Sequence, residues 1–166
     1  MSIATPTMNK PRADQPKTRR KLHLHTMRDI LDDVEMLALG PVDSLGKWTP
    51  AQNIEHIRLL ILIAHRGVDF KMPLSFRVIG KVFKGYFLKA PFRAGFKTVD
   101  IFEPPAEITM QEAVAAFREE VAIADRPGAM SHPSPLLGTM THEQWVQLHC
   151  RHAELHLSFL VPASAN

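Results

Sequence analysis

The sequence predicts an all-α fold, a four-helix bundle built as one domain. Three segments begin with threonine followed three residues later by glutamine or glutamate, which is the capping box of a helix N-terminus. Apolar residues then recur at spacings of three and four, and no segment shows a convincing strand-like alternation. The chain has 166 residues, 45% of them hydrophobic, which is enough to bury one core. We therefore expect four helices of about 13–20 residues each.

The chain before the first helix has a different composition. Residues 1–20 contain three prolines and almost no large apolar residue, so we expect a disordered N-terminal arm there. Thr26 precedes the first predicted helix, and the pair Gly40-Pro41 ends it. This first helix is expected from Met27 to Leu39.

Each of the other three helices begins at a capping box. The second helix also has proline at its first position, which favours a helix start. The predicted helices run from Thr49 to about Val68, from Thr109 to the Arg126-Pro127-Gly128 turn, and from Thr141 to about Leu160. The bundle domain is therefore expected over residues 21–161, and residues 162–166 form a C-terminal tail.

A long irregular segment, residues 70–108, connects the second and third helices. It is rich in aromatic residues, namely Phe70, Phe76, Phe83, Tyr86, Phe87, Phe92, Phe96 and Phe102. Lysines and arginines lie between them, and no acidic residue occurs from Lys71 to Val99. Because so long a connection is uncommon in a compact domain, we expect a short helix near Leu74–Lys84 and a crossover loop packed on the bundle.

Three interpretations of the basic aromatic part, residues 70–97, stay open. Its phenylalanines could cover the end of the bundle while its lysines and arginines face water. It could instead form the mouth of a pocket and steer an anionic substrate or a thiol cofactor that carries carboxylates. It could also contact acidic membrane lipid or nucleic acid.

Composition excludes several classes of protein. A net charge of +3 is too small to argue for nucleic acid by itself, and one cysteine supports neither an internal disulfide nor a cysteine-based zinc site. The longest apolar run, Leu59 to Ala64, is far shorter than the roughly 18–20 residues of a membrane span. The N-terminus has no apolar stretch typical of a signal peptide. We expect a cytoplasmic protein with no stable membrane insertion and no nucleic-acid partner.

The predicted last helix carries three histidines on its apolar stripe. That stripe consists of Trp145, Leu148, His149, His152, His156, Phe159 and Leu160. His152 and His156 lie one helical turn apart, so their imidazoles can reach a single metal ion. Burying several imidazoles costs free energy unless each finds a hydrogen-bond partner or a metal.

The second helix supplies a third candidate ligand. His56 lies on the same stripe as Leu59 and Ile63, so it is expected to face a neighbouring helix. His56, His152 and His156 would offer three neutral nitrogens and an open coordination position, as in catalytic zinc sites. The alternative is a metal-free polar core in which the same histidines only pack.

Other reactive residues are given lesser roles. His65 is expected on the opposite side of its helix from His56, and Glu55 and Glu154 are expected to point away from the histidines. A packed or partly exposed thiol is expected at Cys150 rather than a nucleophile. Solvent exposure is expected for His23, His25, His132, His142 and for the third-helix residues Arg118, Glu119, Glu120 and Asp125. No phosphate-binding loop, nucleophile elbow or carboxylate pair is present in the sequence, so any catalysis must depend on the metal.

Two stretches of sequence resemble a known superfamily. They are Trp48-Thr-Pro-Ala-Gln-Asn-Ile-Glu-His56 and Trp145-x-x-Leu148-x-x-x-His152-x-x-x-His156-Leu. Together with residues 132–145, which lead into the last helix, they resemble the DinB-like superfamily of metal-dependent enzymes, and more narrowly one of its uncharacterised bacterial branches. The resemblance covers about residues 20–161 and is most specific over residues 132–160.

The resemblance implies an up-and-down-type four-helix bundle with a long crossover, and a divalent metal held by His56, His152 and His156. The sequence departs from the branch at Leu155, where a further histidine often stands. His149 is an additional inward histidine. It could hydrogen-bond to one of the metal-binding histidines or act as a proton shuttle. Thiol-dependent S-transferases and isomerases of the superfamily imply thiol transfer, and the same site would also allow hydrolysis.

The leading functional expectation is therefore a metal-dependent enzyme that activates a low-molecular-weight thiol or water. Zinc suits three imidazoles, and nickel and iron accept them too. Its small-molecule substrate, expected to be anionic, would lie between the second and last helices under the 70–108 segment. The rival expectation is a non-catalytic metal-binding module or a structural homodimer, since the second helix is apolar almost all round.

Overall fold

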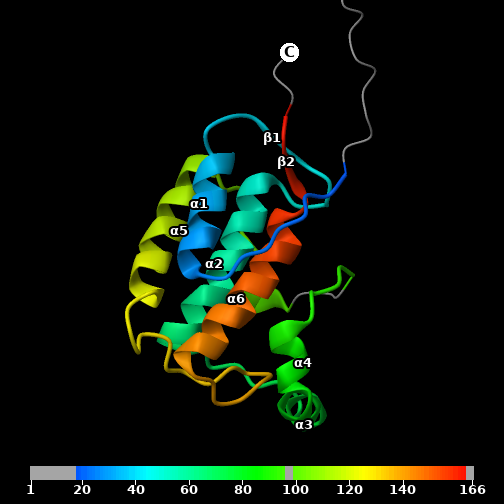
Figure 1. The fold of residues 1–166 in the computed structure, drawn as a ribbon, viewed down its shortest axis with the longest axis vertical. Coiled ribbons are helices and arrows are strands. Elements are labelled where there is room, and N and C mark those ends of the chain that lie inside the picture. Colours follow the sequence, from blue (N-terminus) through cyan, green and yellow to red (C-terminus); the bar gives the residue numbers. More distant parts are fainter. Residues whose placement is uncertain (1–17, 96–98, 164–166) are drawn as a thin grey trace, which may run out of the picture.

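The computed structural model describes residues 18–95 and 99–163, and this part of the chain is mostly helical (Figure 1). The all-α prediction is confirmed in this general form. Most of the expected N-terminal arm and the last three residues of the expected tail lie outside the described residues. The elements are α1 (Met27–Leu37), β1 (Val42–Ser44), α2 (Pro50–Arg66), α3 (Leu74–Val82), α4 (Lys84–Lys89), a 3-10 turn η1 (Asp100–Phe102), α5 (Met110–Ala124), α6 (His142–Leu157) and β2 (Leu160–Pro162).

The four longest helices lie alongside one another (Figure 1). Helix α2 packs against both α5 and α6, and α1 packs against the same two helices from the other side. The apolar sides of α2 are thus covered within one chain, with Ile54, Ile57 and Ile61 fully buried. The apolar character of this helix is explained by its central position and does not require a second copy.

The predicted helix starts are confirmed at the atomic level. The hydroxyl of each N-cap threonine accepts a hydrogen bond from a backbone N–H three residues later, and the side chain at that position accepts one from the cap's own N–H. Each such cap typically stabilises a helix by about 1 kcal/mol. These caps are Thr49, Thr109, Thr141 and also Thr26, which uses Asp29 in the same way.

Two short strands were not expected from the sequence. Strand β1 pairs with β2 in antiparallel register, with Asp43 opposite Val161. Helix α6 ends at Leu157, so the expectation of helix up to Leu160 is wrong for its last three residues. Strands of three residues are too short to show alternation, and their pairing joins distant parts of the chain.

The last residues of the expected arm are docked on the bundle. The backbone N–H of Arg20 donates to the Ser158 carbonyl at 2.9 Å, and its guanidinium forms two hydrogen bonds with the carboxylate of Asp33. The guanidinium of Arg19 lies 4.0 Å from the centre of the Phe159 ring. The expectation of disorder is therefore wrong for residues 18–20, because both arginines find partners that composition does not reveal.

The crossover segment contains two short helices where one was expected. Helix α3 lies at one end of the molecule, and α4 turns from it to run beside α6 (Figure 1). Phe87, Phe92 and Phe102 are partly buried against the core, as expected for aromatic residues that cover the bundle. In contrast, Phe76 and Phe83 are more than half exposed, so they do not serve as a cover.

Helix α3 packs closely on the rest of the protein at Gly80, where there is no room for a larger side chain. A Cβ atom at Gly80 would collide with the carbonyl oxygen of Leu136, whereas at Gly85 it would meet nothing. We expect Gly80→Ala to lower the free energy of unfolding by about 1–3 kcal/mol. The matched control Gly85→Ala should raise it by about 0.5–1 kcal/mol. Urea denaturation followed by circular dichroism measures both, and equal shifts would contradict the close packing of α3.

Candidate metal centre

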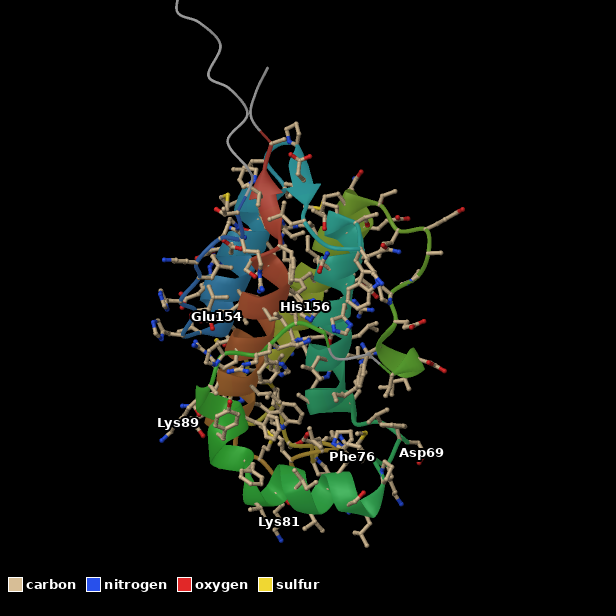
Figure 2. The ribbon with its side chains drawn as sticks, turned by 90° about the vertical axis from the view of Figure 1, so that its right-hand side faces the viewer. Asp69, Phe76, Lys81, Lys89, Glu154 and His156 are labelled. Carbon is tan, nitrogen blue, oxygen red and sulfur yellow. The ribbon has the colours of Figure 1, made fainter. Side chains whose placement is uncertain are left out.

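Three histidines from two helices meet inside the bundle. His56 comes from α2, and His152 and His156 come from successive turns of α6. The three rings lie 4.5–5.0 Å apart between centroids. Figure 2 shows His156 on the side of α6 that faces α2, with Glu154 on the other side. The structure thus brings together the three residues that the sequence predicted as ligands.

The ring nitrogens are close enough to share one ion. One nitrogen from each histidine lies within 4.8 Å of the other two. The Nε2 atoms of His56 and His152 are 3.2 Å apart. Two nitrogens on a tetrahedral zinc ion with bonds of about 2.0–2.1 Å are about 3.3 Å apart. The donor set therefore fits a divalent metal after a small movement of the third imidazole.

Hydrogen bonds orient two of the three imidazoles. His56 donates its Nδ1–H to the carbonyl oxygen of Phe102 at 2.7 Å. The Asn53 amide donates from Nδ2 to the Trp48 and Thr49 carbonyls, so its Oδ1 is left to accept from Nδ1–H of His156 at 3.4 Å. Both bonds use Nδ1 and leave the Nε2 lone pair free. Metal-ligating histidines usually donate their second ring N–H to an acceptor in this way.

Burial keeps the three imidazoles uncharged. It lowers the pKa of His56, and it lowers the pKa of His152 well below its ordinary value, with His156 and His56 adding to the effect on His152. Burial, with His56 and Arg19, lowers the pKa of His156 to about 3. Because metals bind the neutral imidazole, the cluster is in its binding form at neutral pH.

Aromatic side chains surround the cluster. The ring of Trp48 lies 4.7 Å from that of His56 and 5.8 Å from that of His156. Phe92, from the crossover segment, contacts His152 edge-on at 6.1 Å. The segment 70–108 therefore closes over the cluster with Phe92 and the Phe102 carbonyl, as the sequence predicted.

A hollow of about 290 Å³ lies on the side of α6 that carries Arg151, Glu154 and Ser158, which is the side facing away from α2. Phe92 lines this hollow and its ring also contacts His152, so it is the one lining residue with a ring contact to the cluster in the described chain. The remaining lining is mostly basic or polar, with Arg19, Arg20, Lys21, Arg151, Glu154 and Ser158 among its residues.

His149 is fully buried on α6, one turn before His152, and is not one of the three clustered histidines. Its ring stacks on Trp145 with centroids 5.2 Å apart, and neither ring nitrogen has a hydrogen-bond partner in the described chain. Burial, assisted by His142 and His65, lowers the pKa of His149 to about 3. No hydrogen bond joins His149 to the cluster in the described chain. The geometry therefore gives no support to the expectation that His149 orients a metal-binding histidine or shuttles protons.

A second polar cluster links α2 and α5, and the sequence did not predict it. Glu120 is buried and contacts His65, and it accepts a hydrogen bond from Arg58 at 3.0 Å. Arg58 also forms two hydrogen bonds with buried Glu55, each of 2.7 Å. Solvent exposure was therefore the wrong expectation for Glu120, because it lies three residues from buried Phe117 on the face of α5 that packs on α2.

The other assignments are mostly confirmed. His65 lies outside the three-histidine cluster, and His23, His25 and His132 are exposed. Burial raises the pKa of the Cys150 thiol to about 12, which agrees with a packed and unreactive side chain. His142 is the exception, since it is partly buried with an unpartnered Nδ1 atom. Asn53 and Phe102, which orient the imidazoles, had no assigned role, although Asn53 lies one turn before His56.

The fold and the cluster together define a class of protein: a helical domain with a buried three-histidine cluster suited to a metal. The chain belongs to the family described as "Protein of unknown function (DUF1569)", whose model matches residues 16–163. Neither the curated proteins nor the solved structures contain a match to this chain. Within the described residues, every helix is too short or too polar to cross a bilayer.

Proposed function

We propose that this protein is a divalent-metal-dependent enzyme of the DinB-like type, a four-helix bundle with a long crossover that holds one ion on His56, His152 and His156. The observation that carries the proposal is the approach of two Nε2 atoms from different helices to 3.2 Å. The hydrogen bonds behind His56 and His156 support it, because they leave the facing nitrogens free for an ion.

The proposed chemistry is thiol S-transfer or hydrolysis. A divalent ion on three imidazoles, with zinc favoured over nickel or iron, would lower the pKa of a thiol or water in its open position. The Phe102 carbonyl and Asn53 hold two imidazoles in the tautomer that binds. Trp48 and Phe92 limit access of bulk water.

The proposed substrate is a small anionic molecule that enters from the basic hollow at α6. Arg19 and Arg151 line this hollow together with Phe92. An anionic group would be attracted by the arginines, and a turn of the Phe92 ring would open the way to His152. A low-molecular-weight thiol with carboxylates meets the same requirement.

A metal-free polar core is the second candidate, and one observation favours it. His152 can donate Nε2–H to the Nε2 lone pair of His56 across the same 3.2 Å, which satisfies both atoms without an ion. His56 and His152 are only 6% and 7% exposed, so access to them is narrow.

Metal analysis of the purified, tag-free full chain tests the proposal. We expect close to one zinc, nickel or iron ion per chain, either as isolated or after loading and desalting. His152→Ala should weaken zinc binding by at least about 100-fold, more than the loss of a residue that only orients a ligand. The exposed His23→Ala is the matched control and should bind as the wild type does.

The two candidates differ in a second measurement. If the cluster is only a polar core, the loaded chain retains no ion and His152→Leu is as stable as the wild type or more stable, since apolar replacements of buried polar groups are often tolerated. That result would overturn the enzyme proposal. Retained metal with His152→Ala still folded, by circular dichroism, would justify assays of thiol transfer and hydrolysis.

A further inference from the structure

Helix α3 exposes a row of large apolar side chains. Leu74 and Val82 are each 71% exposed, and Val78 between them is 54% exposed. At about 100° per residue these three lie within about 80° of one another, on one face of the helix. Gly80, the buried residue of α3, lies on the opposite face and packs on Leu136. The apolar face therefore points away from the protein.

Other large apolar residues nearby are exposed as well, although not on the same side of the helix. Phe76, Ile79, Phe83 and Tyr86 are each more than half exposed. Figure 2 shows α3 lying across one end of the molecule, with Lys81 at the extremity and Phe76 on the same helix. An exposed apolar surface of this kind marks a contact site for a partner or a membrane. A flat outer surface could meet this helix along its whole length.

Both charged residues of α3 are positive. Arg77 and Lys81 lie one turn apart and flank the apolar row at helical spacing. No acidic residue occurs from Lys71 to Val99, and neither Arg77 nor Lys81 forms an ion pair in the described part of the chain. An exposed apolar face flanked by unpaired basic residues is the pattern of helices that lie in the surface of an anionic bilayer.

We propose that α3 docks the protein on anionic membrane surfaces. Leu74, Val78 and Val82 enter the boundary between headgroups and acyl chains, while Arg77 and Lys81 contact lipid phosphates. Such binding lies within the membrane interface and requires no spanning helix. The inference does not depend on the proposed metal site.

Other partners fit this surface less well. A second copy related by a two-fold axis would place two all-basic segments against each other with no acidic residue in either to neutralise them. Nucleic acid would neutralise the lysines but would leave the exposed aliphatic side chains without cover. An anionic bilayer satisfies both features at once.

Co-sedimentation of the full chain with lipid vesicles tests the proposal. We expect binding to vesicles of phosphatidylcholine mixed with phosphatidylglycerol, and little binding to phosphatidylcholine alone. Binding should weaken as salt is added, because salt screens the attraction between lysines and lipid. Equal binding to both kinds of vesicle, or binding to neither, would overturn the proposal.

Two matched pairs of variants locate the contact. Lys81→Glu should weaken binding at least about fivefold. Lys47→Glu should leave it unchanged, because exposed Lys47 belongs to the loop between β1 and α2, and β1 lies at the opposite end of the molecule from α3 (Figure 1). The double variant Leu74→Ser and Val82→Ser should weaken binding at least about tenfold, since its apolar anchors are lost. Leu39→Ser, at an 88% exposed leucine beyond the end of α1, is its control. Circular dichroism should show native helicity in all four.

Two other results would also overturn the proposal. If light scattering shows a dimer that Val82→Ser dissociates, and vesicles capture nothing, the apolar row is an interface between copies. If the wild type binds a duplex oligonucleotide but not the vesicles, and Lys81→Glu no longer binds the oligonucleotide, the basic residues of α3 bind nucleic acid. Binding to anionic vesicles that the α3 variants lose and the controls keep establishes the docking site.

Discussion

Replacing Glu120 by alanine is expected to lower the free energy of unfolding by about 3 kcal/mol, at the lower end of the 3–5 kcal/mol typical of a broken buried ion pair. The Glu120 side chain is 4% exposed and holds both Arg58 and His65 on the neighbouring helix. Without the Glu120 carboxylate, Arg58 keeps only its ion pair with Glu55, and His65 loses the carboxylate that it contacts. The lower value follows because Arg58 still binds Glu55.

Urea denaturation with Glu119→Ala as the matched control measures this effect. Glu119 is the exposed neighbour on the same helix, so its removal should change the free energy of unfolding by less than about 0.5 kcal/mol. Glu120→Gln keeps the size and an acceptor oxygen but loses the charge, so an intermediate loss is expected. Equal losses for Glu120→Ala and Glu119→Ala would show that the buried pair contributes nothing.

The three-histidine cluster could be predicted from the sequence, whereas the cluster around Glu120 could not. The proximity of His152 and His156 could be predicted because the two residues lie one helical turn apart, and the threonine cap fixes where the helix begins. Glu120 could not be predicted in the same way. Its contacts depend on which side of α5 meets α2, and that follows from the packing of the whole bundle.

Long-range pairing explains the remaining differences. The strands β1 and β2, the docking of Arg20 on Asp33, and the Phe102 carbonyl behind His56 all join segments that are distant or irregular in sequence. None of them has a periodic pattern. The crossover was correctly expected to pack on the rest of the domain, which it does through residues such as Phe92. Its exposed apolar residues, however, could not be distinguished from its buried ones by composition.

Acidification is expected to destabilise the metal-free protein steeply. In the unfolded chain histidine has its ordinary pKa near 6.5, whereas burial lowers the pKa of His149 to about 3 in the folded chain. Between these values the unfolded state binds a proton that the folded state does not, so the free energy of unfolding falls as the pH falls. The slope is at most about 1.4 kcal/mol per pH unit for each such histidine. The three clustered histidines act in the same direction, since burial lowers their pKa too.

His149→Phe isolates one of these contributions. Phenylalanine can keep the stacking on Trp145 while removing two buried nitrogens that have no hydrogen-bond partner. We expect the variant to be at least as stable as the wild type at pH 7. Between about pH 6.5 and 3 its free energy of unfolding should fall less steeply with falling pH, and the two slopes should differ by up to about 1.4 kcal/mol per pH unit. The exposed His23→Ala should keep the wild-type slope. Urea denaturation at several pH values in the presence of a chelator measures all three, and an unchanged slope in His149→Phe would mean that this histidine is protonated in the folded state or finds a partner there.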